Sequence, residues 1–231
     1  MKTSDQNDPK PLPLLVGLQA ARANFLPGLI VQMVMLAIVL AYYFCEPARV
    51  WLAQLAEIKA RWGYGFSFLS AAIAGGVLPE LLTVAVFQRG RVRRDNAGNL
   101  LFGILFWGFQ GMVVDSLYRF QAVLFGAHAD FPTVVKKVLV DQFVYNPFFA
   151  TPFGLAGYEW KNQGYRLAGL GRVLTGRFYK ERTFPALVAA WGVWIPLVSM
   201  IYSLPSLLQI PIFSLALTFW VLLFAWISRQ R

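Results

Sequence analysis

Charged residues, cysteine and histidine are all scarce in this chain of 231 residues. Charged residues make up 14% of it, whereas a soluble domain carries about 25% to keep its surface wetted. The single cysteine, Cys45, excludes a disulfide within the chain. The single histidine, His128, argues against a His/Cys metal site, so we expect no bound metal.

Catalytic motifs are missing as well. The sequence has no nucleophile elbow, no HExxH helix and no phosphate-binding loop. Gly169-Leu170-Gly171 lacks a preceding strand and a correctly spaced third glycine, so it does not make a dinucleotide fingerprint. We therefore expect neither an enzyme nor a resident cofactor.

Apolar residues, by contrast, are abundant. They make up 58% of the chain, with Phe at 20 positions and Trp at 8. The net charge of +10 comes from short basic clusters between apolar runs, which is typical of membrane topology and not of nucleic-acid binding. The composition predicts an all-α fold, a multi-pass transmembrane helical bundle.

A helix needs about twenty apolar residues to span a bilayer, and the chain offers about six such segments. They are residues 25–44, 66–87, 102–125, 134–158, 186–204 and 207–227. The fourth segment contains two prolines and several polar residues, so we expect it to be kinked and it could be partly re-entrant. Residues 47–62 show the pattern of an amphipathic helix in the membrane interface.

The chain divides into three parts on this basis. Residues 1–24 are predicted to be a cytosolic N-terminal tail, disordered at residues 1–13. Residues 25–65 form an extra N-terminal membrane helix plus the interfacial helix, and residues 66–231 form the main bundle.

Basic residues predict the orientation. The outer side receives only Arg49, Lys59, Arg61, Lys136 and Lys137, and Arg119 lies within a segment. Of the 21 Lys and Arg residues, 21 − 6 = 15 therefore fall on the inner side, which predicts cytosolic termini. Within that set, the basic, glycine-rich stretch 161–182 is expected to rest on anionic lipids. The bilayer is thus the predicted partner, nucleic acid is not expected, and a homo-oligomer is compatible with the sequence.

Ionisable side chains within the apolar segments are the first candidate functional residues. A charge in hydrocarbon costs at least ~2.5 kcal/mol, so it usually faces other helices or water. Gly108, Gly111, Asp115 and Arg119 follow helical spacing and form one stripe on the third segment. The glycines permit close approach of a neighbouring helix, and the two charges pair at i, i+4.

The simplest arrangement gathers the buried charges in the bundle centre, where amide side chains complete their hydrogen bonds. The candidate pathway or packing residues are Glu80, Gly108, Gln110, Gly111, Asp115, Tyr118, Arg119, Asp141, Gln142, Asn146 and Pro147. These groups either satisfy one another and fix which helices are neighbours, or line a pathway for ions or small solutes between the second, third and fourth segments. Acid–base catalysis by paired carboxylates is a third reading, but their spacing specifies no reaction.

Three sequence elements follow one another as in a known family. They are Lys136-Lys137-Val138-Leu139-Val140-Asp141-Gln142 with Pro147 after it, Gly108-Phe109-Gln110-Gly111 with Tyr118-Arg119 after it, and Pro185, Trp191, Trp194, Pro196, Pro205, Phe219 and Trp220 towards the C-terminus. Over about residues 75–227, the chain resembles the Mpv-seventeen / twenty-two-kilodalton peroxisomal membrane protein family.

The resemblance implies a multi-pass α-helical protein that acts as a weakly selective channel or in membrane homeostasis. The family's characteristic positions would fall on Gly108, Gly111, Tyr118, Arg119, Asp141, Gln142 and Pro147. Two departures concern function. Asp115 stands where the family tends to carry a small residue, and Val198 and Ile201 stand where it places polar residues.

The resemblance also implies an organelle, either the mitochondrial inner membrane or the peroxisomal membrane. The N-terminal sequence and the strong charge bias favour a bacterial cytoplasmic membrane instead. We take the bacterial membrane as the prediction and the organelle membranes as the alternative.

Overall fold

The computed structural model describes residues 12–167 and 170–228, with side chains described as far as Trp220. In that part of the chain the regular structure is entirely helical, which confirms the all-α class. The helices are α1 (Pro13–Ala23), α2 (Phe25–Phe44), α3 (Glu46–Trp62), α4 (Tyr64–Ala72), η1 (Ile73–Val77), α5 (Leu78–Leu82), η2 (Thr83–Phe87), α6 (Arg94–Phe125), α7 (Phe131–Val140), η3 (Asp141–Ala150), α8 (Thr151–Asn162), α9 (Leu170–Val173), α10 (Gly176–Phe178), η5 (Tyr179–Thr183), α11 (Phe184–Tyr202) and α12 (Ser206–Ser228), where η marks a π-helical stretch.

Four of the described helices are long and apolar enough to cross a membrane. They are Phe25–Phe44, Tyr64–Phe87, Arg94–Phe125 and Gly176–Tyr202. A shorter apolar helix covers Ser206–Trp220. The continuous helix α7–η3–α8, which holds the fourth predicted segment, is not among the four. Six crossings therefore stay a prediction.

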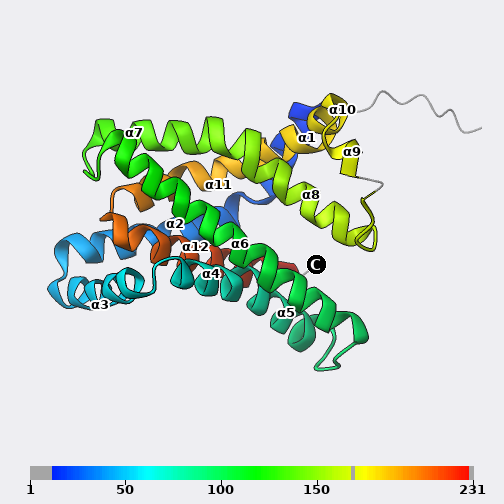
Figure 1. Ribbon diagram of the computed structural model, residues 1–231, viewed down its shortest axis with the longest axis horizontal. Helices are drawn as coiled ribbons and strands as arrows, with labels where there is room; N and C mark the ends of the chain where they lie inside the picture. Colours follow the sequence, from blue (N-terminus) through cyan, green and yellow to red (C-terminus); the bar gives the residue numbers. More distant parts are fainter. Residues whose placement is uncertain (1–11, 168–169, 229–231) are drawn as a thin grey trace, which may run out of the picture.

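The long helices run back and forth along one axis of the molecule (Figure 1). The helix α3, the α6–α7 connection and the α11–α12 connection lie at one end, on the left of the figure. The α5–α6 connection and the end of α8 lie at the other end. The α5–α6 connection and α3 therefore lie at opposite ends of the bundle.

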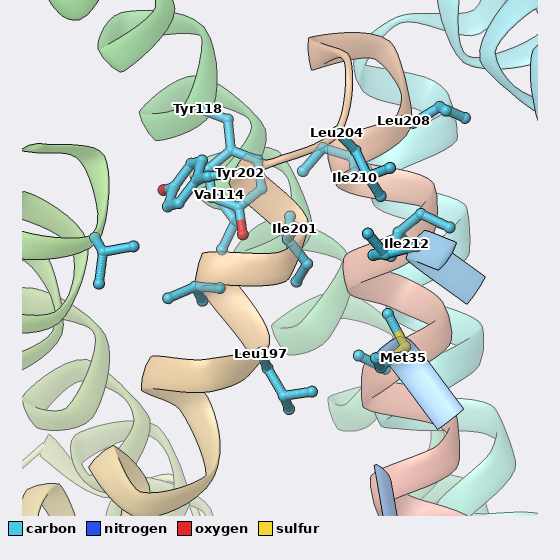
Figure 2. Close-up of a cluster of buried hydrophobic side chains, with 14 of the residues drawn as sticks. Met35, Val114, Tyr118, Leu197, Ile201, Tyr202, Leu204, Leu208, Ile210 and Ile212 are labelled. Atoms are coloured by element: carbon cyan, nitrogen blue, oxygen red, sulfur yellow. The ribbon is translucent and has the colours of Figure 1, made fainter. Parts of the chain in front are cut away.

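One apolar cluster joins the helices in the middle of the bundle. It includes Met35 of α2, Tyr118 of α6, Leu197 and Tyr202 of α11, and Ile212 of α12 (Figure 2). All five side chains are buried. Many other large apolar side chains face outward, which is the pattern expected where lipid replaces water as the solvent.

The predicted tail over residues 1–24 contains a helix. Residues 13–23 form helix α1, which packs against α11. The contact is close at Gly17, where an added Cβ would lie 2.7 Å from Cβ of Val188. The stretch is too short to span a bilayer, but its apolar residues suffice to pack on a neighbouring helix. Residues 1–11, the rest of the predicted disordered stretch, lie outside the described residues.

Small residues bring α6 into close contact with the helix formed by α4 and η1. A Cβ at Gly76 would lie 2.5 Å from the carbonyl carbon of Gly103, and one at Gly111 would lie 2.5 Å from Cβ of Ala71. Only a residue without a side chain allows backbones to approach this closely. The predicted glycine stripe on α6 therefore does face a neighbouring helix, which is α4.

The irregularity predicted for the fourth segment takes the form of a π-helix. The stretch η3 covers Asp141–Ala150 and contains Pro147, whose missing N–H and bulky ring disturb regular α-helical bonding. Wider π-helical turns of this kind occur often at functional sites. In this protein, η3 carries Asp141, Gln142 and Asn146.

Candidate functional site

A cavity of about 440 Å³ lies between α6, the η3–α8 helix, α11 and α12. Its polar lining residues are Gln110, Asp141, Gln142, Tyr145, Asn146 and Thr151. Its aromatic lining residues are Phe106, Trp107, Tyr118, Tyr158, Trp194 and Phe213. This volume and this mixture of apolar walls with a few polar groups are typical of small-molecule sites.

Asp141 is the centre of the hydrogen-bond network in the cavity wall. Tyr202 donates from its hydroxyl to Oδ2 of Asp141 at 2.6 Å, and Gln142 donates from Nε2 to Oδ1 at 2.8 Å. Both contacts are buried. A carboxylate inside a helical bundle is costly unless such donors surround it.

Tyr202 and Gln142 each also accept a hydrogen bond from another side chain. Gln121 donates from Nε2 to the hydroxyl of Tyr202 at 3.0 Å. Asn146 donates to Oε1 of Gln142 at 3.3 Å, and Thr151 donates to Oδ1 of Asn146 at 2.7 Å. Two chains of hydrogen bonds therefore converge on Asp141, and every donor in them points toward the carboxylate.

This common direction has an electrostatic consequence. Hydrogen bonds arranged in a chain polarise one another, and bonds to an ionised acceptor are stronger than neutral ones. Both chains therefore favour the negatively charged form of Asp141. The arrangement therefore offsets part of the cost of burying a negative charge in the cavity wall.

Two buried polar atoms of the described lining residues have no hydrogen-bond partner. They are Oε1 of Gln110 and the hydroxyl oxygen of Tyr145, and both atoms are buried. Gln110 comes from α6 and Tyr145 from η3, so they belong to different walls of the cavity. A buried polar atom that lacks a partner is unfavourable, so each of these two atoms would gain from a ligand that reached it.

Asp115 takes part in a different cluster. It accepts from Lys59 Nζ at 2.5 Å, from the hydroxyl of Ser67 at 2.7 Å and from Arg119 Nε at 3.0 Å. Lys59 and Asp115 are buried, whereas the Arg119 side chain is 51% exposed and lies over the ring of Tyr64. None of these groups is among the residues that line the cavity.

Glu80 lies apart from both clusters. Its Oε1 accepts from Nδ2 of Asn96 at 2.5 Å, and Asn96 also caps the start of α6 by accepting from the backbone N–H of Arg93. This contact joins α5 to the beginning of α6, at the end of the bundle opposite α3.

The expected gathering of all buried charges in the bundle centre is therefore wrong. Of the candidate residues, six line the cavity: Gln110, Gly111, Tyr118, Asp141, Gln142 and Asn146. The others lie elsewhere, with Asp115 and Arg119 beside α3, Glu80 beside Asn96, Gly108 against Phe68, and Pro147 buried in η3. The charges separate because each finds a polar partner close to it.

The sequence indicated the buried charged residues, but not the side chains of other helices that pair with them. The sequence places Lys59 among the outer-side basic residues, within the predicted interfacial helix 47–62. In the structure, Leu52, Ala56 and Lys59 share one face of α3, and the first two pack on the core. Tyr202 and Gln121 were not predicted, because an uncharged polar residue in a largely apolar helix gives only a weak signal. Tyr145 lies within the predicted segment, but nothing in the sequence marked its hydroxyl as unpartnered.

No family model matches the chain, and neither a curated protein nor a solved structure does so.

Proposed function

We propose that this chain is an integral membrane protein whose helices enclose a pathway for small polar solutes. The four membrane-length apolar helices and the outward-facing apolar side chains support insertion into a bilayer. On α3, Trp51 and Trp62 are 72% and 59% exposed, which supports a place for this helix in the membrane interface.

One observation supports the pathway above all. A cavity of about 440 Å³ lies between helices of membrane length, and its lining combines the Asp141 network with unpartnered polar atoms of Gln110 and Tyr145. Polar and ionisable groups at membrane depth commonly mark solute or ion pathways. The proposed role is passage of a solute, without catalysis.

The remaining sequence predictions are part of this proposal. Both termini would lie on the cytosolic side, with anionic lipids against the basic stretch 161–182. A bacterial cytoplasmic membrane is the favoured location. Membership of the Mpv-seventeen / twenty-two-kilodalton peroxisomal membrane protein family stays a prediction from the residues that resemble it.

A structural role is the second candidate. It is favoured by the full set of partners around Asp115, which ties α3, α4 and α6 together without facing the cavity. In this reading the protein organises helices in the membrane and carries no solute. The cavity network would then only fix the position of the π-helix.

Gly154 allows the two functions to be separated. It lines the cavity, and an added Cβ there would meet no atom within 4 Å. The variant Gly154→Leu should therefore fold normally while filling part of the cavity. Gly98→Leu is the matched control, because Gly98 also has open space at its Cβ but lies outside the cavity lining.

The measurement is osmotic swelling of proteoliposomes in urea and glycerol. We expect the wild-type protein and Gly98→Leu to accelerate swelling over empty liposomes, and Gly154→Leu to reduce that gain by roughly twofold or more, because access depends on the width of the pathway. If swelling is no faster than in empty liposomes, the proposed pathway is wrong and the structural role is the remaining candidate. Equal swelling with Gly154→Leu would show that solutes pass elsewhere.

A further inference from the structure

We infer that the cavity binds a small organic cation, with Asp141 as its counter-charge. The inference deepens the proposed function, on which it rests, by naming the chemical class of the ligand. It follows from the charges, the free acceptors and the aromatic walls of the cavity, which are taken in turn below.

Asp141 is the one acidic residue among the described lining residues, and that set includes neither Lys nor Arg. Lys137 lies one helical turn before Asp141, but its Nζ has no hydrogen-bond partner and lies 6.0 Å from the centre of the Tyr202 ring. The basic groups near Asp115 are engaged with that carboxylate instead. The cavity therefore presents a negative charge without a hydrogen-bonded cation.

Two neighbouring side chains already donate hydrogen bonds to Asp141. Tyr202 and Gln142 each occupy one site on the carboxylate, which has about four acceptor sites in total. Sites on Asp141 therefore remain for a donor from outside the protein. Gln110 is another lining residue whose Oε1 has no hydrogen-bond partner in the protein, and the residue is 9% exposed. An ammonium group supplies donors and positive charge together.

The aromatic walls favour the same class of ligand. Tyr118, Trp194 and Phe213 line the cavity from α6, α11 and α12. The faces of aromatic rings attract cations, more strongly where water is excluded, and they also pack against apolar carbon. An organic cation with an apolar body fits this lining better than a hydrated metal ion or an anion does.

Three probes of nearly equal shape test the charge. They are benzylamine, which is a cation near neutral pH, benzyl alcohol, which is neutral, and benzoate, which is an anion. Binding to the protein in lipid nanodiscs is measured by titration calorimetry, with empty nanodiscs as the blank. We expect saturable binding of benzylamine, weaker binding of benzyl alcohol and no saturable binding of benzoate.

Asp141→Asn is the main variant, because it removes the charge and keeps the shape. We expect it to weaken benzylamine binding at least about tenfold, since hydrogen bonds to a charged group contribute that much, and to leave benzyl alcohol binding nearly unchanged. Glu80→Gln is the matched control, since the same change occurs at a carboxylate outside the cavity lining. It should bind like the wild-type protein.

Tyr145→Phe keeps the test decisive if Asp141→Asn fails to fold. It removes only a hydroxyl that has no partner in the protein, so its fold should be intact. We expect benzylamine binding to weaken by about threefold, the value of one neutral hydrogen bond. Equal binding of benzylamine by the wild-type protein and a folded Asp141→Asn variant would overturn the inference, as would unchanged binding by Tyr145→Phe when only that variant folds.

The swelling experiment separates this inference from the proposed function. If binding depends on charge but the protein does not accelerate swelling, the cavity is a ligand site and the proposed pathway is wrong. If the protein accelerates swelling but binds all three probes equally, the pathway is supported and the inferred preference for cations is wrong.

Discussion

Lys59 on α3 donates to Asp115 on α6 with 2.5 Å between Nζ and Oδ2, and their side chains are only 2% and 4% exposed. Lys59 also donates to the backbone carbonyl of Gly63 at 2.9 Å. The contact joins a helix predicted to lie in the membrane interface to α6 of the bundle. This ion pair explains why the Asp115 carboxylate can be buried in α6 although it does not line the cavity.

Breaking this pair should strongly destabilise the protein. Removal of Asp115 leaves the Lys59 charge buried and without its counter-charge, which costs about 3–5 kcal/mol. Removal of Lys59 leaves Asp115 with only the half-exposed Arg119 as an ion-pair partner. We expect a large fall in thermal stability in detergent for Lys59→Met and for Asp115→Leu. The double variant should recover much of the loss, because no unpaired charge remains from this pair.

Arg119→Gln is the control for that series. The Arg119 side chain is half exposed, so its ion pair with Asp115 should contribute no more than about 1 kcal/mol. If Lys59→Met costs no more than Arg119→Gln, the buried pair does not hold α3 in place.

The close approach at Gly76 gives a second prediction. Its added Cβ would meet the backbone of Gly103, which cannot move aside as a flexible side chain does. Gly76→Ala should therefore destabilise the protein by about 2 kcal/mol, as overpacking does elsewhere. Gly98→Ala on α6 meets open space and should be neutral or stabilising by up to about 1 kcal/mol. Equal thermal stability of the two variants would show that the helices are not in backbone contact.

The lone cysteine allows a test of orientation. Cys45 is exposed at the boundary of α2 and α3, at the end of the bundle predicted to face outward. A membrane-impermeant maleimide added to intact cells should label it. In a Cys45→Ser background, Arg91→Cys at the opposite end should react only after the cells are opened. The reverse labelling pattern would show that the topology is opposite to the predicted one.

Asp130 gives a prediction that depends on pH. It caps the start of α7, where the backbone N–H of Thr133 donates to Oδ1 at 3.1 Å, and hydrogen bonding by Thr133 lowers the pKa of Asp130. Because the pKa is lower in the folded state, the stability from ionised Asp130 is present above its unfolded pKa of about 3.9. That stability is lost as pH falls through the folded pKa.

The comparison is between the wild-type protein and Asp130→Asn. Asparagine also caps a helix but does not ionise, so it provides the same hydrogen bond without the charge. The thermal stability advantage of the wild-type protein should be present at about pH 6 and shrink at about pH 3. An advantage that stays constant over that range would show that the carboxylate charge does not stabilise this cap.

The apolar runs predicted the helices well, because about twenty consecutive apolar residues leave few alternatives to a long helix. The helix bearing Asp141 was also predicted, along with its irregularity near Pro147. The partition of the charges was not predictable, because it depends on which polar residue of another helix lies within hydrogen-bond distance. Lys59 and Asn96 lie outside the apolar runs that carry the other buried charges.

Polar groups on α11 show the same limit. Val198 and Ile201 stand where the resembled family places polar residues, and both are buried in the apolar cluster. The polar group that α11 does supply to the Asp141 network is Tyr202, just one residue beyond Ile201. A tyrosine at the end of an apolar helix is usually explained by the membrane interface, so its buried role required the structure.

Access of water to the cavity is the most direct test of a solute pathway. In a Cys45→Ser background, Gly154→Cys places a thiol on the cavity lining, and a small hydrophilic methanethiosulfonate reagent reports whether water reaches it. We expect the native protein in proteoliposomes to react and the reaction to slow swelling in urea. A thiol at position 154 that reacts only after the protein is unfolded would contradict the account.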